Sequence, residues 1–152
     1  MDSRGETLKH IKEVAHTINL FKKELKKRAK NHDKSKMESP EVEIFDEYTP
    51  KLKGSTYGSD EYKEYLKEMK VALDHHYKNN QHHPEFHPSG IDSMNLIDII
   101  EMFSDWVAAT KRHEDGDMRR SLDINKTRFN MSDQLYNILL NTLVALEDSN
   151  QI

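Results

Sequence analysis

The chain has 152 residues, 35% hydrophobic and 33% charged, with a formal net charge of -4 at pH 7. This length predicts one domain with its own core, and the small net charge together with periodic apolar residues excludes a disordered chain. Because the chain has no cysteine, disulfides and thiolate metal sites are excluded, and imidazole and carboxylate groups must hold any metal. No apolar run approaches the length of a membrane span, so we expect a cytoplasmic protein.

The first predicted helix covers residues 7–30. Its apolar side chains recur at intervals of three and four residues, which is typical of one helical face. This stripe consists of Ile11, Val14, Ile18, Phe21 and Leu25. His10 lies one turn before Val14, so we expect it to face inward with the stripe, whereas His16 is expected to face solvent.

Two further helices are predicted in the first half of the chain. Residues 39–53 form a short helix with Pro40 in its first turn, and residues 59–77 form a long one. The segment 53–59 between them contains two glycines and small polar residues, and we expect it to be a loop and a candidate lid. Tyr57 in this loop is a candidate for stacking on a substrate.

The long helix over residues 59–77 carries two adjacent histidines. Met69 and Leu73 mark its buried face, because both lie on one side at helical spacing. His76 continues that face and is predicted to point inward. His75 is predicted to point toward solvent.

Residues 79–90, NNQHHPEFHPSG, are predicted to be irregular, because Asn, Pro and Gly disfavour a helix there. The tetrapeptide HHPE within this segment supplies two further imidazoles, those of His82 and His83. Both lie within reach of the predicted inward-facing His76.

The most apolar helix is predicted over residues 93–112, and it also carries one acidic stripe, Asp98, Glu101 and Asp105. Burial of three unpaired carboxylates would cost several kcal/mol each, so they must meet cations, donors or water. Asp98 and Glu101 could meet lysines at a wet edge, whereas Asp105 is flanked by large apolar residues and is expected in a site. Two alanines beyond it would leave room for a ligand, and Arg112 follows them.

Two more helices are predicted at residues 117–129 and 132–147, and no segment shows the sustained alternation of a strand. The predicted fold is therefore all-α, with about six helices in one irregular bundle that forms a single domain over residues 1–152.

The stretch NHDKSK places a His32–Asp33 pair in a lysine-rich segment, with Lys36 one turn later. Together with an inward His76, the HHPE histidines and Asp105, this pair predicts a metal site. A set of imidazoles and carboxylates without thiolate suits Mn, Fe, Co, Mg or Zn.

The order of these residues resembles the H…HD…H…HH…D signature of the HD-domain superfamily of metal-dependent phosphohydrolases. HDKSK is similar to the HDxGK of its HD-GYP branch, with Lys36 at the lysine position, and HHPE resembles the HHE of that branch. Most of the chain also resembles an uncharacterised family of small HD-like proteins from bacteria and their phages. The segments that carry this second resemblance are NHDKSK, YTPKLKGSTYGS, HHPE and EMFSDW.

The resemblance implies an all-helical HD-like domain that hydrolyses a nucleotide or a related phosphoester with one or two divalent ions. Asp33 would bridge the two ions, either His82 or His83 would serve the second, and Asp33 and Lys36 would be the catalytic residues. A metal-bound hydroxide would attack phosphorus. The residues implied to hold metal are His10, His32, Asp33, His76, His82, His83 and Asp105.

A shared ion requires the chain to turn between His10 and His32. One straight helix over both residues would place them about 33 Å apart, at about 1.5 Å per residue. A turn near Asn19 would fold His10 back, although the apolar stripe runs through that point in phase.

The expected partner is a small phosphoester or nucleotide, with no membrane and no duplex nucleic acid, and a homo-oligomer is an open possibility. Candidate substrate contacts are Lys36, Glu101, Arg112 and Arg128. Two other functions fit the same residues. One is an all-α, magnesium-dependent nucleotide pyrophosphatase that uses the acidic stripe, and the other is a non-catalytic module that binds a nucleotide or a partner, such as a phage factor acting on its host.

Overall fold

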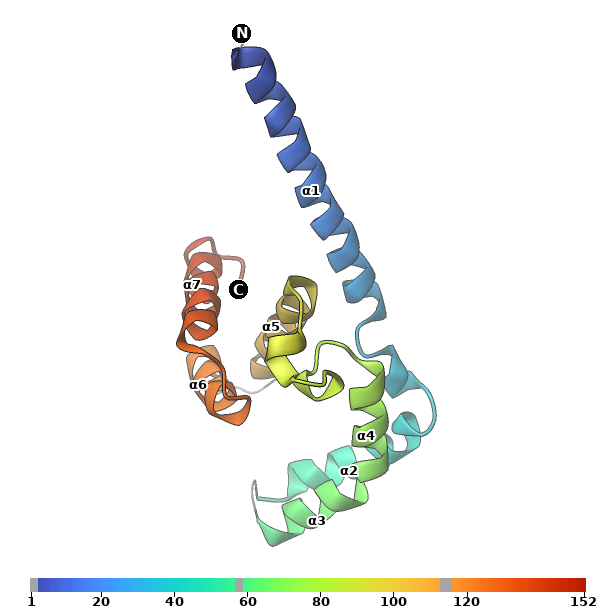
Figure 1. Cartoon of the computed structure of the whole chain (residues 1–152). Helices are drawn as coiled ribbons and strands as arrows, with labels where there is room; N and C mark the ends of the chain where they lie inside the picture. The colour runs from blue at the N-terminus through green and yellow to red at the C-terminus, as the bar shows by residue number, and fades with distance from the viewer. Residues whose placement is uncertain (1–2, 57–58, 113–115) are drawn as a thin grey trace. The chain divides into compact units, whose positions relative to one another are not determined.

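A computed structural model of the chain describes residues 3–56, 59–112 and 116–152. All regular secondary structure in these residues is helical, as predicted (Figure 1). The α-helices are α1 (Ser3–Asn31), α2 (Glu41–Gly54), α3 (Asp60–Glu68), α4 (Lys70–Asn79), α5 (Leu96–Thr110), α6 (Met118–Arg128) and α7 (Asp133–Asp148). Three short 3-10 helices connect them: η1 (Lys34–Met37), η2 (Pro84–Phe86) and η3 (Gly90–Ser93).

The predicted long helix over residues 59–77 is divided into α3 and α4. Met69, which lies between them, has a ψ of -3°, whereas a regular α-helix has a ψ of about -42°. Met69 is also among the buried side chains. The change of direction therefore occurs at a residue that packing holds in place, and no proline or glycine marks it in the sequence.

The contacts of the chain divide it into two compact units, Met1–His76 and Tyr77–Ile152. The boundary falls inside α4, so one helix belongs to both units. In the first unit, α2 packs against η1 and α3. Its buried side chains combine apolar Met69 and Ala72 with polar Glu41 and His76.

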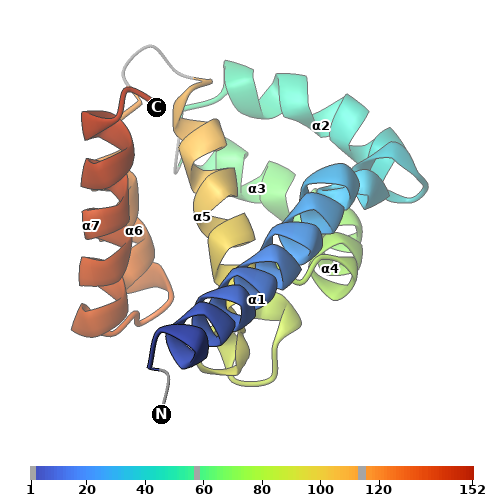
Figure 2. The ribbon, with the colours of Figure 1, turned by 90° about the horizontal axis from the view of Figure 1, so that it is seen from above.

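The second unit has an apolar core formed mainly by side chains of α5, α6 and α7. Figure 2 shows the ribbon of these three helices from above. Arg119 pairs with Glu147 and Lys126 pairs with Asp133, so the start of α6 lies beside the end of α7 and the two helices are antiparallel. The buried residues of this core are Ile99, Met102, Phe103, Met118, Leu122, Met131, Leu139 and Leu143.

Helix α1 differs from the prediction in what it buries. It continues without a break from Ser3 to Asn31, and none of its residues is buried. The prediction that His10 faces inward is therefore wrong. Amphipathic spacing identifies an apolar face, but it does not show that the same chain covers that face.

No helix in the described parts of the chain is both long enough and apolar enough to cross a membrane. The loop predicted over residues 53–59 falls partly outside the described residues, and Tyr57 lies outside them altogether.

Candidate metal centre

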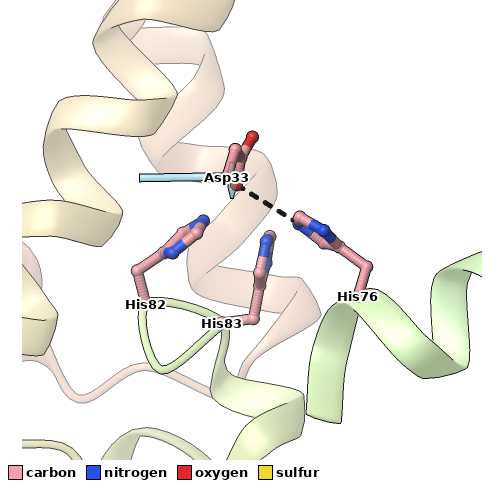
Figure 3. Close-up of side chains that lie close together, drawn as sticks. All are labelled: Asp33, His76, His82 and His83. Atoms are coloured by element: carbon pink, nitrogen blue, oxygen red, sulfur yellow. Dashed lines mark ion pairs between the residues drawn. The ribbon is translucent and has the colours of Figure 1, made fainter. Parts of the chain in front are cut away.

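In the first unit, His76 is buried between two carboxylates. Its Nδ1–H donates to Glu41, with 2.9 Å between Nδ1 and Oε2. Its Nε2 faces Asp33, with 3.4 Å between Nε2 and Oδ1 (Figure 3). That distance is longer than a normal hydrogen bond of about 2.7–3.2 Å. It is close to the separation of about 3.4 Å expected for a nitrogen and an oxygen that bind one tetrahedral metal ion at about 2.0–2.2 Å.

Glu41 is the acceptor that fixes this histidine. It begins α2 and is completely buried. His75 also donates to it, with 2.6 Å between Nδ1 and Oε1. The His75 side chain is 37% exposed, so it reaches solvent as predicted and in addition pairs with Glu41. Burial alone would raise the pKa of Glu41, but its hydrogen bonds with His75, His76 and Ser35 lower it. A carboxylate that orients a histidine leaves Nε2 available to bind metal.

Asp33 occupies the turn after α1, with a left-handed φ of 54°. Few residues other than glycine adopt this region, and Asn and Asp are the most tolerant of them. Lys36 donates to its Oδ2 at 2.7 Å, and the His32 Nε2 lies 3.6 Å from the same oxygen. Burial would raise the pKa of Asp33, but His76, Lys36 and His32 outweigh burial and hold that pKa well below its usual range.

In the second unit, His82 lies between a glutamate and an aspartate, as His76 does in the first unit. It is buried, its Nδ1 lies 3.2 Å from Glu101 Oε1, and its Nε2 lies 3.9 Å from Asp105 Oδ2. Both carboxylates come from α5, one turn apart. Two members of the predicted acidic stripe, Glu101 and Asp105, therefore face a buried histidine.

Asp98 has a structural role at the start of α5. Its side chain accepts from the backbone N–H of Asn95 while Asn95 accepts from the backbone N–H of Asp98, which is a capping box. The His87 Nε2 lies 3.7 Å from the Asp98 Oδ2. This residue is therefore buried for a reason that requires no ligand.

His83 follows His82 on the loop after α4, and the two ring centroids lie 4.1 Å apart (Figure 3). Tyr77 meets the His83 ring edge-on at 5.1 Å. Arg128 contacts the same loop through Glu85, with 2.9 Å between Nη2 and Oε1. The loop that carries both histidines is therefore attached to the end of α6.

Both units contribute histidine and carboxylate side chains to groups that could hold a metal ion. The first unit contributes His32, Asp33 and His76, and the second contributes His82, His83 and Asp105. Two of the predicted site residues, His10 and Arg112, lie away from the candidate metal ligands of their own units. His10 lies three-quarters of the way back along unbroken α1, about 30 Å from its C-terminal end at about 1.5 Å per residue. Arg112 is exposed beyond the end of α5.

Glu41 was missed by sequence reasoning. An acidic residue directly after a proline is common in the first turn of a helix, where it complements the helix dipole. Nothing in the local pattern indicated that this one would be buried against two histidines that are more than thirty positions later in the chain.

The model of a family of unknown function, DUF5662, matches residues 1–145. The chain belongs to this family. Neither a curated protein nor a solved structure matches the chain. Membership in DUF5662 spans both units and every candidate ligand, and it assigns no activity to them.

Proposed function

We propose that this chain is a metal-dependent phosphohydrolase with one or two divalent ions, and that Asp33, His76, His82 and His83 are among the metal ligands. The observation that carries this proposal is the arrangement found in both units. In each unit a buried histidine has one ring nitrogen against a glutamate and the other facing an aspartate. Metal-binding histidines are held in this way by carboxylates that fix the ring orientation.

Ligand number agrees with metal binding. A catalytic metal commonly has three protein ligands and an open position. The first unit contributes three candidate ligands, His32, Asp33 and His76, and the second unit also contributes three.

The residues around the ligands have distinct roles in this proposal. Glu41 orients His76, and Glu101 orients His82. Lys36 places its ammonium group beside Asp33, where it would attract the phosphate of a substrate. Histidine and carboxylate ligands suit Mn, Fe, Co, Mg or Zn, and the bound ion would lower the pKa of a coordinated water and polarise the phosphoester.

The substrate in this proposal is a nucleotide or a related small phosphoester, and the place of action is the cytoplasm. The similarity of HDKSK and HHPE to motifs of HD-domain phosphohydrolases supports this choice of reaction. Arg128, at the loop that carries His82 and His83, would provide a second positive charge for the substrate.

The first test compares the metal content and phosphoesterase activity of the wild-type chain and Asp33→Asn, after incubation with Mn²⁺. Asparagine is preferred to alanine because it tolerates the left-handed backbone at this position. We expect Asp33→Asn to lose the metal and at least a hundredfold in turnover of a generic aryl phosphodiester or phosphomonoester. His16→Ala, which changes an exposed histidine on α1, should retain both. Full turnover by Asp33→Asn would refute the proposal.

A second test examines the ligands of each unit. Asp33→Asn and His82→Ala change different units. We expect each variant to lose at least one equivalent of bound metal. A variant that keeps the full metal content would show that the residue it changes is not a ligand.

A non-catalytic metal-dependent binding module is the main alternative, and metal binding without turnover of any phosphoester would favour it. The pyrophosphatase alternative has less support. It requires the acidic stripe of α5 to face magnesium, but Asp98 caps the helix and Glu101 contacts His82.

A further inference from the structure

Helix α1 carries an apolar stripe that the rest of its own unit leaves largely exposed. None of the 29 residues of α1 is buried, and the side chains of Ile11, Val14, Ile18 and Phe21 are 41–54% exposed. Helices in proteins gain most of their stability by packing an amphipathic face against a partner. A continuous row of exposed apolar side chains of this kind commonly marks an interaction surface.

The spacing of the stripe matches a helix-to-helix seam. Ile11, Ile18 and Leu25 are seven residues apart, and Val14 and Phe21 fall between them with the same seven-residue interval. Apolar residues that alternate at three and four positions occupy the core of a two-stranded coiled coil. The α1 seam, defined as these five residues, therefore fits another helix better than it fits a flat surface.

We propose that the α1 seam binds the α1 seam of a second copy of this chain, with the two helices antiparallel. Charge distinguishes the two possible directions. Residues 17–31 contain six basic residues and one acidic residue, whereas residues 3–16 contain three basic and two acidic. A parallel pair would place the two strongly basic halves side by side. An antiparallel pair places each basic half beside the nearly neutral half of the other copy, which reduces the repulsion.

The seam is also suited to pairing with itself. Arg28 occupies the next position of the seven-residue repeat after Phe21, so a parallel pair would bring two arginines together in its core. An antiparallel pair instead sets Arg28 beside the opposite end of the seam. The same patch then meets itself across a two-fold axis near the middle of α1, which is the usual symmetry of a homodimer. This proposal does not depend on the proposed metal site.

The first experiment measures the mass of the full chain in solution by light scattering and sedimentation over a range of concentrations. We expect a dimer for the wild type and at least a tenfold weaker dimer for Ile18→Glu. Leu20→Glu is the matched control, because Leu20 is also about half exposed but points away from the seam. Since both residues are exposed, neither change should unfold the chain, and circular dichroism would check this. A monomer at 100 µM, or a dimer that resists Ile18→Glu, would overturn the proposal.

The second experiment determines the direction of the helices. The chain has no cysteine, so Ile11→Cys and Leu25→Cys each introduce a single thiol. With a short bismaleimide crosslinker, an antiparallel pair should link Ile11→Cys to Leu25→Cys in a mixture and should give little product from either variant alone. Efficient crosslinking of each variant to itself would show a parallel pair. If the seam is instead covered by the second unit of the same chain, the protein would be monomeric and the thiols would be protected.

Discussion

Glu41 is a buried carboxylate that fixes the orientation of a candidate metal ligand without being a ligand itself. It accepts hydrogen bonds from His75 and His76, and it would touch no ion itself. Because the Nδ1–H of His76 is held, the opposite nitrogen of the ring is directed at Asp33. The residue therefore acts through His76, as a positioning residue.

Replacing Glu41 with glutamine keeps the volume but removes the charge, and one of the two histidines then faces an amide N–H. We expect Glu41→Gln to weaken metal binding ten- to a hundredfold, because the orientation of His76 is lost. The metal-free protein should also lose about 2 kcal/mol of stability, the usual contribution of hydrogen bonds to a charged group. Metal titration and urea unfolding measure the two effects. Asp46→Asn, an exposed carboxylate on the same helix, is the control. Unchanged metal affinity in Glu41→Gln would contradict the positioning role.

The sequence indicated which side of a helix is buried more reliably than it indicated which residues contact that side. His76 continues the buried side of its helix and is buried, as predicted. The same reasoning failed for His10, which is exposed on α1. For the partly exposed His75 it did not indicate the pairing with Glu41, because Glu41 comes from another helix.

At the scale of helices, α6 and α7 are joined at both ends by ion pairs. Arg119 donates two hydrogen bonds to Glu147, at 2.8 and 2.7 Å, and Lys126 pairs with Asp133. The Arg119 hydrogen bonds and charge lower the pKa of Glu147. These pairs lie at the rim of the apolar core, where water screens them.

The Arg119–Glu147 pair predicts a pH-dependent effect. Since the pKa of Glu147 is lower in the folded state, the pair stabilises the fold fully above the ordinary glutamate pKa of about 4.3. That stabilisation is lost as the pH falls through the lowered pKa. We expect Glu147→Gln to lower Tm slightly at pH 7 and not at pH 2.5, with the exposed Asp148→Asn as control. An equal loss of Tm at both pH values would show that the effect comes from packing rather than charge.

Helix boundaries followed local chemistry where a cap was present. Ser59, Asn95, Asp117 and Ser132 each accept a backbone N–H at a helix start, and the sequence placed most of these starts within a few residues. The break at Met69 had no such signal. Its cause is burial, and burial depends on the other helices.

At the scale of the whole molecule, the two units are joined through α4, and the candidate ligands lie on both sides of that junction. An ion that binds only the folded state stabilises the part of the chain that supplies its ligands. The single tryptophan, Trp106, packs against the apolar core of the second unit, so its fluorescence reports on the folding of that unit.

This stabilisation can be measured. At a Mn²⁺ concentration of 100 times Kd, the ion should add about 2.7 kcal/mol to stability, and Trp106 fluorescence should show a higher Tm. We expect His82→Ala, a change in the second unit, to abolish that shift. If His82→Ala leaves the Mn²⁺-induced shift unchanged, His82 is not a metal ligand.

The sequence by itself determined the all-helical class, most helix positions and the absence of thiolate ligands, because these follow from periodicity, caps and composition, which are local. It also indicated that His76 is buried, since one helix face carries that information. Only the tertiary structure decided that Glu41 meets two histidines, that Glu101 and Asp105 meet His82, and that the α1 stripe is left exposed. Each of these depends on which surfaces meet across long stretches of chain. A pattern along one helix shows what that helix can bury, but not what buries it.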